Sequence, residues 1–410
     1  MPAPSHGETP DVLFVQAGTI SKDTFGSSWH VSGELPDELP PAREYWLVFR
    51  YEHQQVPDVA IAPMLDVSLA RIQALAQRRH VNIAGIQLDI DSPTASLPQY
   101  ARLLREVRNN LPSKTQISIT ALLDWFRDGT AVADVIKETD EFVPQFYDAG
   151  DPQNNNEGAI ATSLDAAKWA PRFNRFRKRY RIGISTFGRA RFVPRENAAQ
   201  PEKSHSIYFR DLTMLDIASD PAFHLQTARS NANELMLNYG VTREHAIGYN
   251  RLAPGDTLQF ILSTPEGVQA AVESARRLRG YCAGVVFFRW PVADESMALQ
   301  PDEVLSAASA DSQAKNKTPS IQQVDGACAA VSCADLYLLD ATRFSPAPIR
   351  YRIHSATELE YFLPEEKVPI RMRDPSALEL SLPAYCGRGR LFLGRAVAAK
   401  RTDFTVEVLP

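Results

Sequence analysis

The chain has 410 residues, of which 44% are hydrophobic and 23% charged, and its formal net charge is -5. This composition is typical of a folded globular protein and excludes a fibrous repeat or a disordered chain. The acidic balance argues against a nucleic-acid partner, because binding to phosphates requires a basic surface. No stretch of 18 consecutive apolar residues is present, so we expect no membrane span.

Eight short apolar runs follow one another along the first three quarters of the chain, and helical stretches separate most of them. Alternation of strands and helices is typical of a parallel sheet with crossover helices. Eight such units with right-handed connections predict a closed (β/α)8 barrel, known as a TIM barrel. The runs cover residues 12–18, 44–52, 82–91, 115–125, 141–148, 180–188, 257–263 and 283–291.

The connection between the sixth and seventh runs is unusually long. It contains two alternating runs that predict a hairpin inserted at about 232–251. After the last barrel run, residues 305–320 are small, polar and aperiodic, as in a linker. Apolar residues then recur with a period of two, which predicts a small antiparallel β-sandwich. We therefore expect a barrel over 1–304, the linker, and a sandwich over 321–410.

The third predicted strand ends in an acidic segment, IAGIQLDID (83–91). Side chains alternate along a strand, so Gln87, Asp89 and Asp91 share one face. Unpaired carboxylates are disfavoured in a barrel interior, whereas the carboxyl ends of the strands carry catalytic groups. Two acids roughly 6 to 7 Å apart influence each other, so one tends to hold a proton, as a general acid of glycosidic cleavage must. The alternative is a polar turn at Asp91 that caps the next helix.

Three segments in this order resemble the chitinase-like family 18 glycoside hydrolases. That family carries DGIDIDWE at the end of one barrel strand, MTYD at the end of a later one, and Trp at the end of the last. The corresponding segments here are AGIQLDID (84–91), QFYD (145–148) and VVFFRW (285–290). Ala84 and Gln87 stand where the family has Asp.

The family resemblance implies four residue roles. Asp91 would be the general acid, Asp89 its partner, Tyr147 a support for the reacting sugar, and Trp290 the floor of the pocket. At position 91 the family has Glu, so the acid here is one methylene shorter.

The whole chain resembles more closely an uncharacterised bacterial family of glycosidase-like barrels that is known only as a domain of unknown function. The shared segments are GIQLDID, SITALLDW, VPQFYD and the sandwich tail. This resemblance implies the fold and leaves the substrate open.

Other polar and aromatic side chains end predicted strands and therefore belong to the same rim. Asp148 and Asp124 are candidates for the second carboxylate of a two-acid glycosidase. Flat aromatic rings and hydrogen-bonding side chains suit sugars. Rim ion pairs, helix caps and core packing are the alternatives for each. The candidate substrate contacts are Gln87, Asp124, Trp125, Gln145, Arg50, Glu52, Arg289 and Trp290.

Motifs of other chemistries are missing from the sequence. It has no phosphate-binding glycine loop, CxxC pair, HExxH or GxSxG segment, so we predict neither a cofactor nor a metal site. Asp89, Asp91 and His53 remain a minor alternative as ligands of a divalent cation.

The cysteines bear on the compartment. Cys282, Cys328, Cys333 and Cys386 are even in number, and Cys328 and Cys333 are close enough to close a small loop. An even number of cysteines is weakly in favour of an oxidising compartment. No signal peptide is visible at the start. We expect a periplasmic or secreted protein, with a cytoplasmic location still open.

Together these features predict a glycoside hydrolase that acts on a bacterial oligo- or polysaccharide, with Asp91 as the acid and Asp89 tuning it. The alternative is a catalytically silent barrel that binds glycan, or a scaffold in envelope polysaccharide assembly. The oligomeric state stays open.

Overall fold

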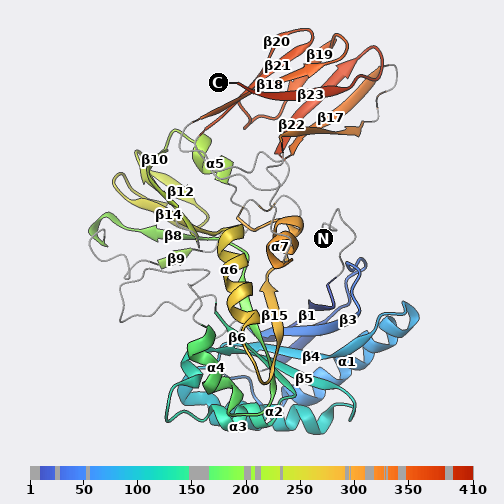
Figure 1. The fold of residues 1–410 in the computed structure, drawn as a ribbon, viewed down its shortest axis with the longest axis vertical. Coiled ribbons are helices and arrows are strands. Elements are labelled where there is room, and N and C mark those ends of the chain that lie inside the picture. The colour runs from blue at the N-terminus through green and yellow to red at the C-terminus, as the bar shows by residue number, and fades with distance from the viewer. Residues whose placement is uncertain are drawn as a thin grey trace. The chain divides into compact units, whose positions relative to one another are not determined.

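The computed structural model describes residues 10–23, 28–51, 56–146, 166–197, 205–207, 214–230, 234–290, 295, 297–309, 318–326, 328, 331–339, 348–383 and 391–409. The chain divides into two compact units, and each is described by itself (Figure 1). The first contains Met1–Ala149, Ala161–Ser185 and Val268–Phe288, and the second contains Gly150–Ile160, Thr186–Gly267 and Arg289–Pro410.

An eight-stranded sheet forms the centre of the first unit, in the order β15-β7-β6-β5-β4-β3-β1-β2. Neighbouring strands pair in parallel except β1 and β2, which form an antiparallel pair. The strands are β1 (Val12–Lys22), β2 (Trp29–Gly33), β3 (Glu44–Tyr51), β4 (Ile83–Ile90), β5 (Gln116–Leu122), β6 (Glu141–Gln145), β7 (Arg179–Ser185) and β15 (Cys282–Phe288).

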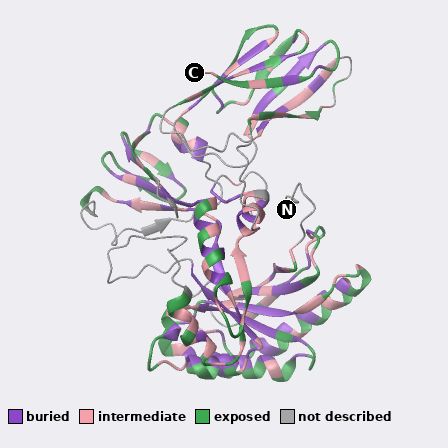
Figure 2. Cartoon of the chain, viewed as in Figure 1, coloured by how far each residue is buried: buried purple, intermediate pink, exposed green. Residues whose placement is uncertain are grey.

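Helices gather on one side of this sheet (Figure 1). They are α1 (Ile61–Arg78), α2 (Leu97–Asn110), α3 (Val132–Lys137) and α4 (Ala166–Asn174), with short 3-10 turns at η1 (Thr94–Ser96) and η2 (Leu123–Phe126). Ile86, Leu88 and Ile90 of β4 are fully buried, as are Leu103 and Leu104 of α2. Figure 2 shows the same division, with exposed residues on the outer sides of these helices. The predicted parallel sheet with crossover helices is therefore confirmed for this unit.

The prediction of a closed eight-stranded barrel is wrong, because the sheet is open, with β15 and β2 as its edges. The predicted seventh barrel strand is β14 (Thr257–Ser263), which belongs to a five-stranded sheet of the second unit. There it pairs antiparallel with β11 and β8. Leu258, Phe260 and Leu262 are buried in that unit. The apolar run of β14 is compatible with a strand of either the eight-stranded or the five-stranded sheet. The strands β8 and β11 lie close to β14 along the chain and are available as its antiparallel partners.

The five-stranded sheet has the order β10-β11-β14-β8-β9. Besides β14 it contains β8 (Arg189–Val193), β9 (His205–Ile207), β10 (Phe223–Ser230) and β11 (Glu234–Val241). A short hairpin of β12 (His245–Ile247) and β13 (Asn250–Leu252) lies between β11 and β14 in the chain. The described helical segments of the second unit are η3 (Arg195–Asn197), α5 (Met214–Ser219) and α7 (Pro301–Ala308). Helix α6 (Pro265–Arg276) begins in the second unit and belongs to the first unit from Val268 on.

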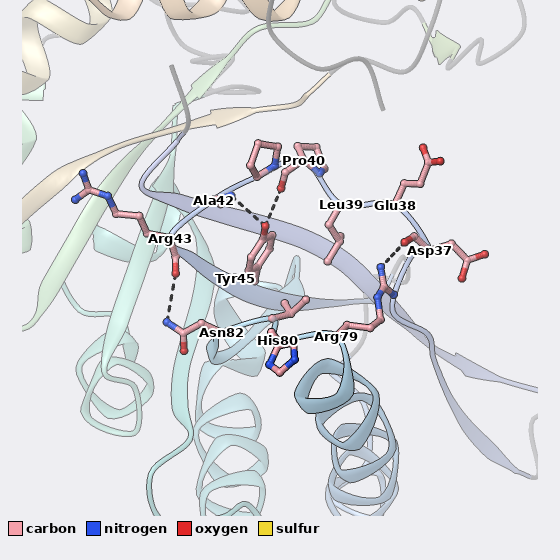
Figure 3. Close-up of a pocket in the computed structure, with 12 residues that line it drawn as sticks. Asp37, Glu38, Leu39, Pro40, Ala42, Arg43, Tyr45, Arg79, His80 and Asn82 are labelled. Carbon is pink, nitrogen blue, oxygen red and sulfur yellow. Dashed lines mark hydrogen bonds between the residues drawn. The ribbon is translucent and has the colours of Figure 1, made fainter. Parts of the chain in front are cut away.

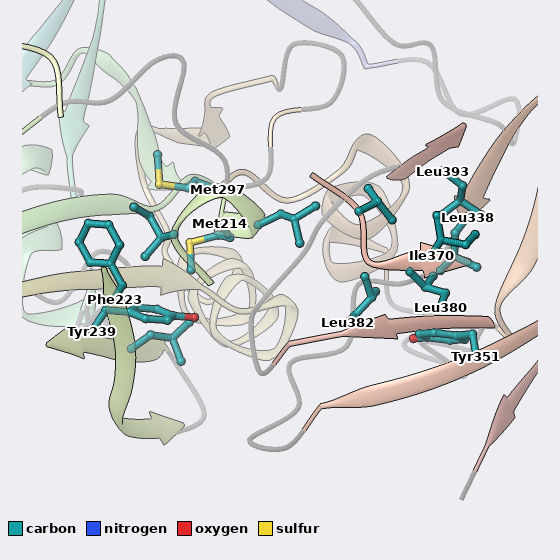
Figure 4. Packing of buried hydrophobic residues seen from close by; sticks show 14 of the residues in the cluster. Met214, Phe223, Tyr239, Met297, Leu338, Tyr351, Ile370, Leu380, Leu382 and Leu393 are labelled. Atoms are coloured by element: carbon teal, nitrogen blue, oxygen red, sulfur yellow. The ribbon is translucent and has the colours of Figure 1, made fainter. Parts of the chain in front are cut away.

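Two four-stranded antiparallel sheets complete the second unit, as expected for a β-sandwich. Their orders are β16-β17-β22-β19 and β20-β21-β18-β23. Figure 4 shows buried side chains of the unit, among them Leu338, Tyr351 and Leu380 from these sheets. The strands are β16 (Ser320–Asp325), β17 (Ser332–Leu339), β18 (Ile349–Ser355), β19 (Tyr361–Pro364), β20 (Ile370–Asp374), β21 (Ala377–Leu382), β22 (Leu391–Ala398) and β23 (Phe404–Leu409).

Candidate active site

Asp89 lies near the carboxyl end of β4, on the face opposite the buried isoleucines and leucine. Thr120 Oγ1 of β5 donates a hydrogen bond of 2.7 Å to Asp89 Oδ1. Arg50 Nε of β3 lies 3.8 Å from Asp89 Oδ2. The Asp89 side chain is 17% exposed and that of Arg50 37%. The strands β3 and β5, on either side of β4, thus hold the Asp89 carboxylate between the Thr120 hydroxyl and the Arg50 guanidinium at the carboxyl end of the sheet.

Asp91 is the first residue after β4, and it is exposed. The next residue, Ser92, is fully buried, and its amide donates to Ile90 O at 2.8 Å. Trp125 Nε1 of η2 donates to Ser92 O at 2.8 Å. Two hydrogen bonds therefore fix the backbone that follows the exposed Asp91.

The alternative role of Asp91 as a helix cap finds no support in the described turn. The N-cap residues of η1 and α2 are Pro93 and Ser96, and neither helix has a side-chain cap hydrogen bond.

Tyr100 of α2 is a residue of this site that sequence reasoning missed. Its side chain is fully buried, and its hydroxyl has no hydrogen-bond partner in the described part of the chain. Burial raises the pKa of Tyr100 well above its ordinary value, and the negative charges of Asp89 and Asp91 raise it further. Both carboxylates therefore act on one buried phenol. The only sequence signal was an apolar helical position occupied by Tyr.

Gln87 and Gln145 are buried on neighbouring parts of the sheet. Gln87 Nε2 donates to Ser118 Oγ of β5 at 3.1 Å. Gln145 ends β6 and is 7% exposed. The face of the sheet that carries Asp89 has further polar side chains on β6 and β7. Glu141 Oε1 of β6 lies 2.8 Å from Arg181 Nε of β7. This face is polar over four consecutive strands.

Two candidates on η2 differ from each other. Asp124 is exposed and pairs with Arg127 of the same turn, Oδ1 to Nη2, at 2.7 Å. Trp125 is fully buried, and its ring meets that of Tyr100 edge to face at 5.8 Å between centroids. A sugar needs an exposed ring face, so we leave Trp125 out of the proposed substrate contacts.

The remaining candidates cannot be placed beside Asp89. Arg289 and Trp290 follow β15 and belong to the second unit, where Arg289 forms an ion pair with Glu295 and Trp290 is half-buried. Glu52, His53, Tyr147 and Asp148 lie outside the described residues. Their roles stay predictions.

A pocket of about 620 Å³ lies at the amino ends of β3 and β4, whereas Asp89 and Asp91 lie at the carboxyl end of β4 (Figure 3). Asn82 of this pocket and Asp91 are nine residues apart along β4, which is roughly 30 Å at about 3.3 Å per residue. Tyr45 Oη donates to Pro40 O at 2.8 Å, and Arg79 Nη1 donates to Pro36 O at 2.7 Å. Because Tyr45 and Arg79 use their polar groups to bind the backbone of the loop around the pocket, we do not place the candidate active site in this pocket.

No group of three or more His, Cys, Asp or Glu side chains is placed to hold a metal ion among the residues that the structure describes. Over those residues, too, no helix combines the length and apolar character that crossing a membrane requires.

The solved structures that are similar to this chain include two spore cortex-lytic enzymes and a chitinase. The spore cortex-lytic enzyme SleL of Bacillus cereus is 14% identical, with a TM-score of 0.43 over 73% of this chain and 67% of its own. SleL of Bacillus megaterium QM B1551 is 12% identical, with a TM-score of 0.37 over 64% of this chain and only 58% of its own. The chitinase RmChi1 of Rhizomucor miehei is 11% identical, with a TM-score of 0.40 over 64% of this chain and 84% of its own. Likenesses of this degree carry no information on activity.

A search of curated proteins gave no match. The comparison with protein families matched residues 43–227, from the start of β3 into β10, to the family described as "Domain of unknown function (DUF3142)". Residues 43–227 are therefore similar to this family, which confirms the predicted resemblance to a family known only as a domain of unknown function.

Proposed function

We propose that the chain is a glycoside hydrolase-like enzyme that cleaves a bacterial polysaccharide, with Asp91 as general acid and Asp89 as its partner. One observation carries the proposal. An exposed carboxyl group stands directly beyond a buried strand, next to a second carboxylate that Arg50 and Thr120 hold in place. The carboxyl end of a parallel sheet is where enzymes of α/β folds place their reacting groups.

In this mechanism the protonated Asp91 carboxyl group donates its proton to the glycosidic oxygen as the bond to the anomeric carbon breaks. The leaving sugar departs as an alcohol, and water adds to the anomeric carbon. A proton from that water restores the acid. Asp89 supplies a fixed negative charge beside the site, which stabilises the positive charge that develops on the sugar ring.

Further proposed roles come from the family resemblance and from positions at the ends of predicted strands. By resemblance, Tyr147 would support the reacting sugar and Trp290 would form the floor of the pocket. By its position at the end of a predicted strand, Asp148 would be the second carboxylate. Gln145, Asp124, Arg50, Glu52 and Arg289 are the proposed sugar contacts. The Gln87 side chain donates a hydrogen bond to Ser118 and would hold β5 in register with β4.

The chain's compartment and division into domains are part of the proposal. Cys328 and Cys333 form a disulfide, and such bonds persist mainly in oxidising compartments, which supports a periplasmic or secreted protein. We keep the division into a barrel-like domain (1–304), a linker (305–320) and a sandwich domain (321–410) as a proposal.

A second function has one observation in its favour. Asp91 is one methylene shorter than the Glu of the family 18 motif, and misplacement near 1 Å can lower a rate about a hundredfold. The alternative is accordingly a catalytically silent barrel that binds glycan or acts as a scaffold in polysaccharide assembly.

The test is release of reducing ends from a panel of acetamido-sugar and neutral-sugar polysaccharides, with glycan binding measured on the same panel. An active hydrolase releases reducing ends from at least one of them. Binding without release supports the silent barrel, and the absence of both contradicts both functions.

A further inference from the structure

One face of the sandwich carries four arginines, which we call the arginine face: Arg350 and Arg352 of β18, and Arg371 and Arg373 of β20. In β18 the arginines alternate with Tyr351 and Ile353, which are 3% and 0% exposed. Tyr351 and Ile353 therefore point into the sandwich, and Arg350 and Arg352, which alternate with them, lie on its outer side. Arg352 and Arg371 are both register partners of Glu379 on β21.

Three of these arginines share one carboxylate. Glu379 accepts from Arg352 and Arg371 at 3.4 Å each and from Arg373 at 3.3 Å. Opposite Arg352 stands Glu407 of β23, also at 3.4 Å. Burial raises the pKa of Glu379, but the hydrogen bonds and charges of Arg352, Arg373 and Arg371 together outweigh burial and lower the pKa below its ordinary value, so the carboxylate is charged at neutral pH.

The arginine face keeps an excess of positive charge. Four arginines face three carboxylates, those of Glu379, Glu407 and Asp374, so one positive charge is in excess, in a chain whose net charge is -5. His354 also lies here, 3.4 Å from Glu407, and Asp374 at the end of β20 accepts from Ser376. The side chains of Arg371 and Arg373 are 76% and 59% exposed. A guanidinium has five N–H donors, so a single contact to Glu379 leaves most of them available to a ligand.

We infer that the arginine face binds an anionic polysaccharide with spaced carboxylates, such as a polyuronate. The choice of a glycan rests on the proposed function, and the choice of an anion rests on the charges. All four cations are arginines, whose planar fork matches a carboxylate in a bidentate manner. Arg350 and Arg352 lie about 7 Å apart along the strand.

The spacing of charges argues against a denser polyanion. Glu379 and Glu407 alternate with the arginines across the sheet. A duplex nucleic acid, with one phosphate charge per roughly 1.7 Å, would place phosphates against both glutamates. A polyuronate carries hydroxyls between its carboxylates, and hydroxyls can donate to those glutamates.

The experiment measures binding of the full-length protein to polygalacturonate and to its methyl-esterified form, which has the same sugars without the charge. The first variant, R371Q/R373Q, removes two exposed guanidinium groups. The second, E379Q, removes the internal carboxylate that competes with the ligand. The control, R401Q, removes an exposed arginine that pairs with Asp325 at 3.6 Å outside the face.

We expect binding to polygalacturonate that weakens as salt increases, and little binding to the ester. R371Q/R373Q should bind about tenfold more weakly, E379Q more tightly, and R401Q like the wild type. Opposite effects of the two variants cannot both come from misfolding. Equal binding of acid and ester, unchanged binding in R371Q/R373Q, or equally tight binding of duplex DNA or anionic vesicles would overturn the inference.

Failure of this inference and failure of the proposed function are distinguishable. D91N leaves the arginine face intact, so it should retain polygalacturonate binding whether or not the chain hydrolyses any glycan.

Discussion

The hydrogen bond from Thr120 to Asp89 offers the most defined test of how the sheet holds its carboxylate. Thr120 is 6% exposed and the Asp89 side chain 17%, and their oxygens are 2.7 Å apart. A hydrogen bond to a charged group at such a site contributes about 1.5 to 3 kcal/mol. T120V exchanges the hydroxyl for a methyl group of similar size, so the change isolates this bond.

The assay is urea unfolding of the wild type, T120V, D89A and the double variant. The free energies of unfolding of these four proteins form a double-mutant cycle, whose coupling term we expect to be about 1.5 to 3 kcal/mol. T120S keeps the hydroxyl and should retain the coupling to Asp89. A coupling below about 0.5 kcal/mol, the range within which independent sites add, would refute the contact.

Three further predictions concern the same unit. E141Q leaves Arg181, 13% exposed, without its ionic partner, so the free energy of unfolding in urea should fall by about 3 to 5 kcal/mol; a loss below about 1 kcal/mol would contradict the buried pair. W125F leaves Ser92 O without its donor and should lower stability by about 1 to 3 kcal/mol, and an unchanged thermal midpoint would show that the turn does not need the indole. Burial, with a smaller effect of Cys282, raises the pKa of Tyr180 to about 12, whereas an unfolded tyrosine ionises near 10. Stability is therefore present below pH 10 and declines as pH rises from about 10 to 12; Y180F should decline less, and an equal decline would contradict the shift.

The parallel sheet was predictable because its strands and helices differ in period and alternate along the chain. The end of β4 was predictable for the same reason, since a period of two places Gln87 and Asp89 opposite three buried apolar residues. Arg50 was predicted at the same rim from its position at a strand end. The structure adds the contact between Arg50 and Asp89.

Other features depend on contacts that no local pattern specifies. The choice of sheet for β14 depends on its partners, because its apolar run is compatible with both. Thr120 lies beside Asp89 through the register of two strands 31 residues apart in sequence. Trp125 was expected to offer a ring to sugar, but η2 turns it into the core against Tyr100. Residue type alone does not separate a buried tryptophan from an exposed one.

The central claim, that Asp91 is the acid of a glycosidase, is tested most directly by the turnover of D91N on a glycan that the wild type cleaves. The control is D128N, which neutralises an aspartate whose side chain is 89% exposed, in the loop after η2. The account predicts that D91N loses hydrolysis while D128N retains the wild-type rate. Unchanged turnover in D91N would contradict it.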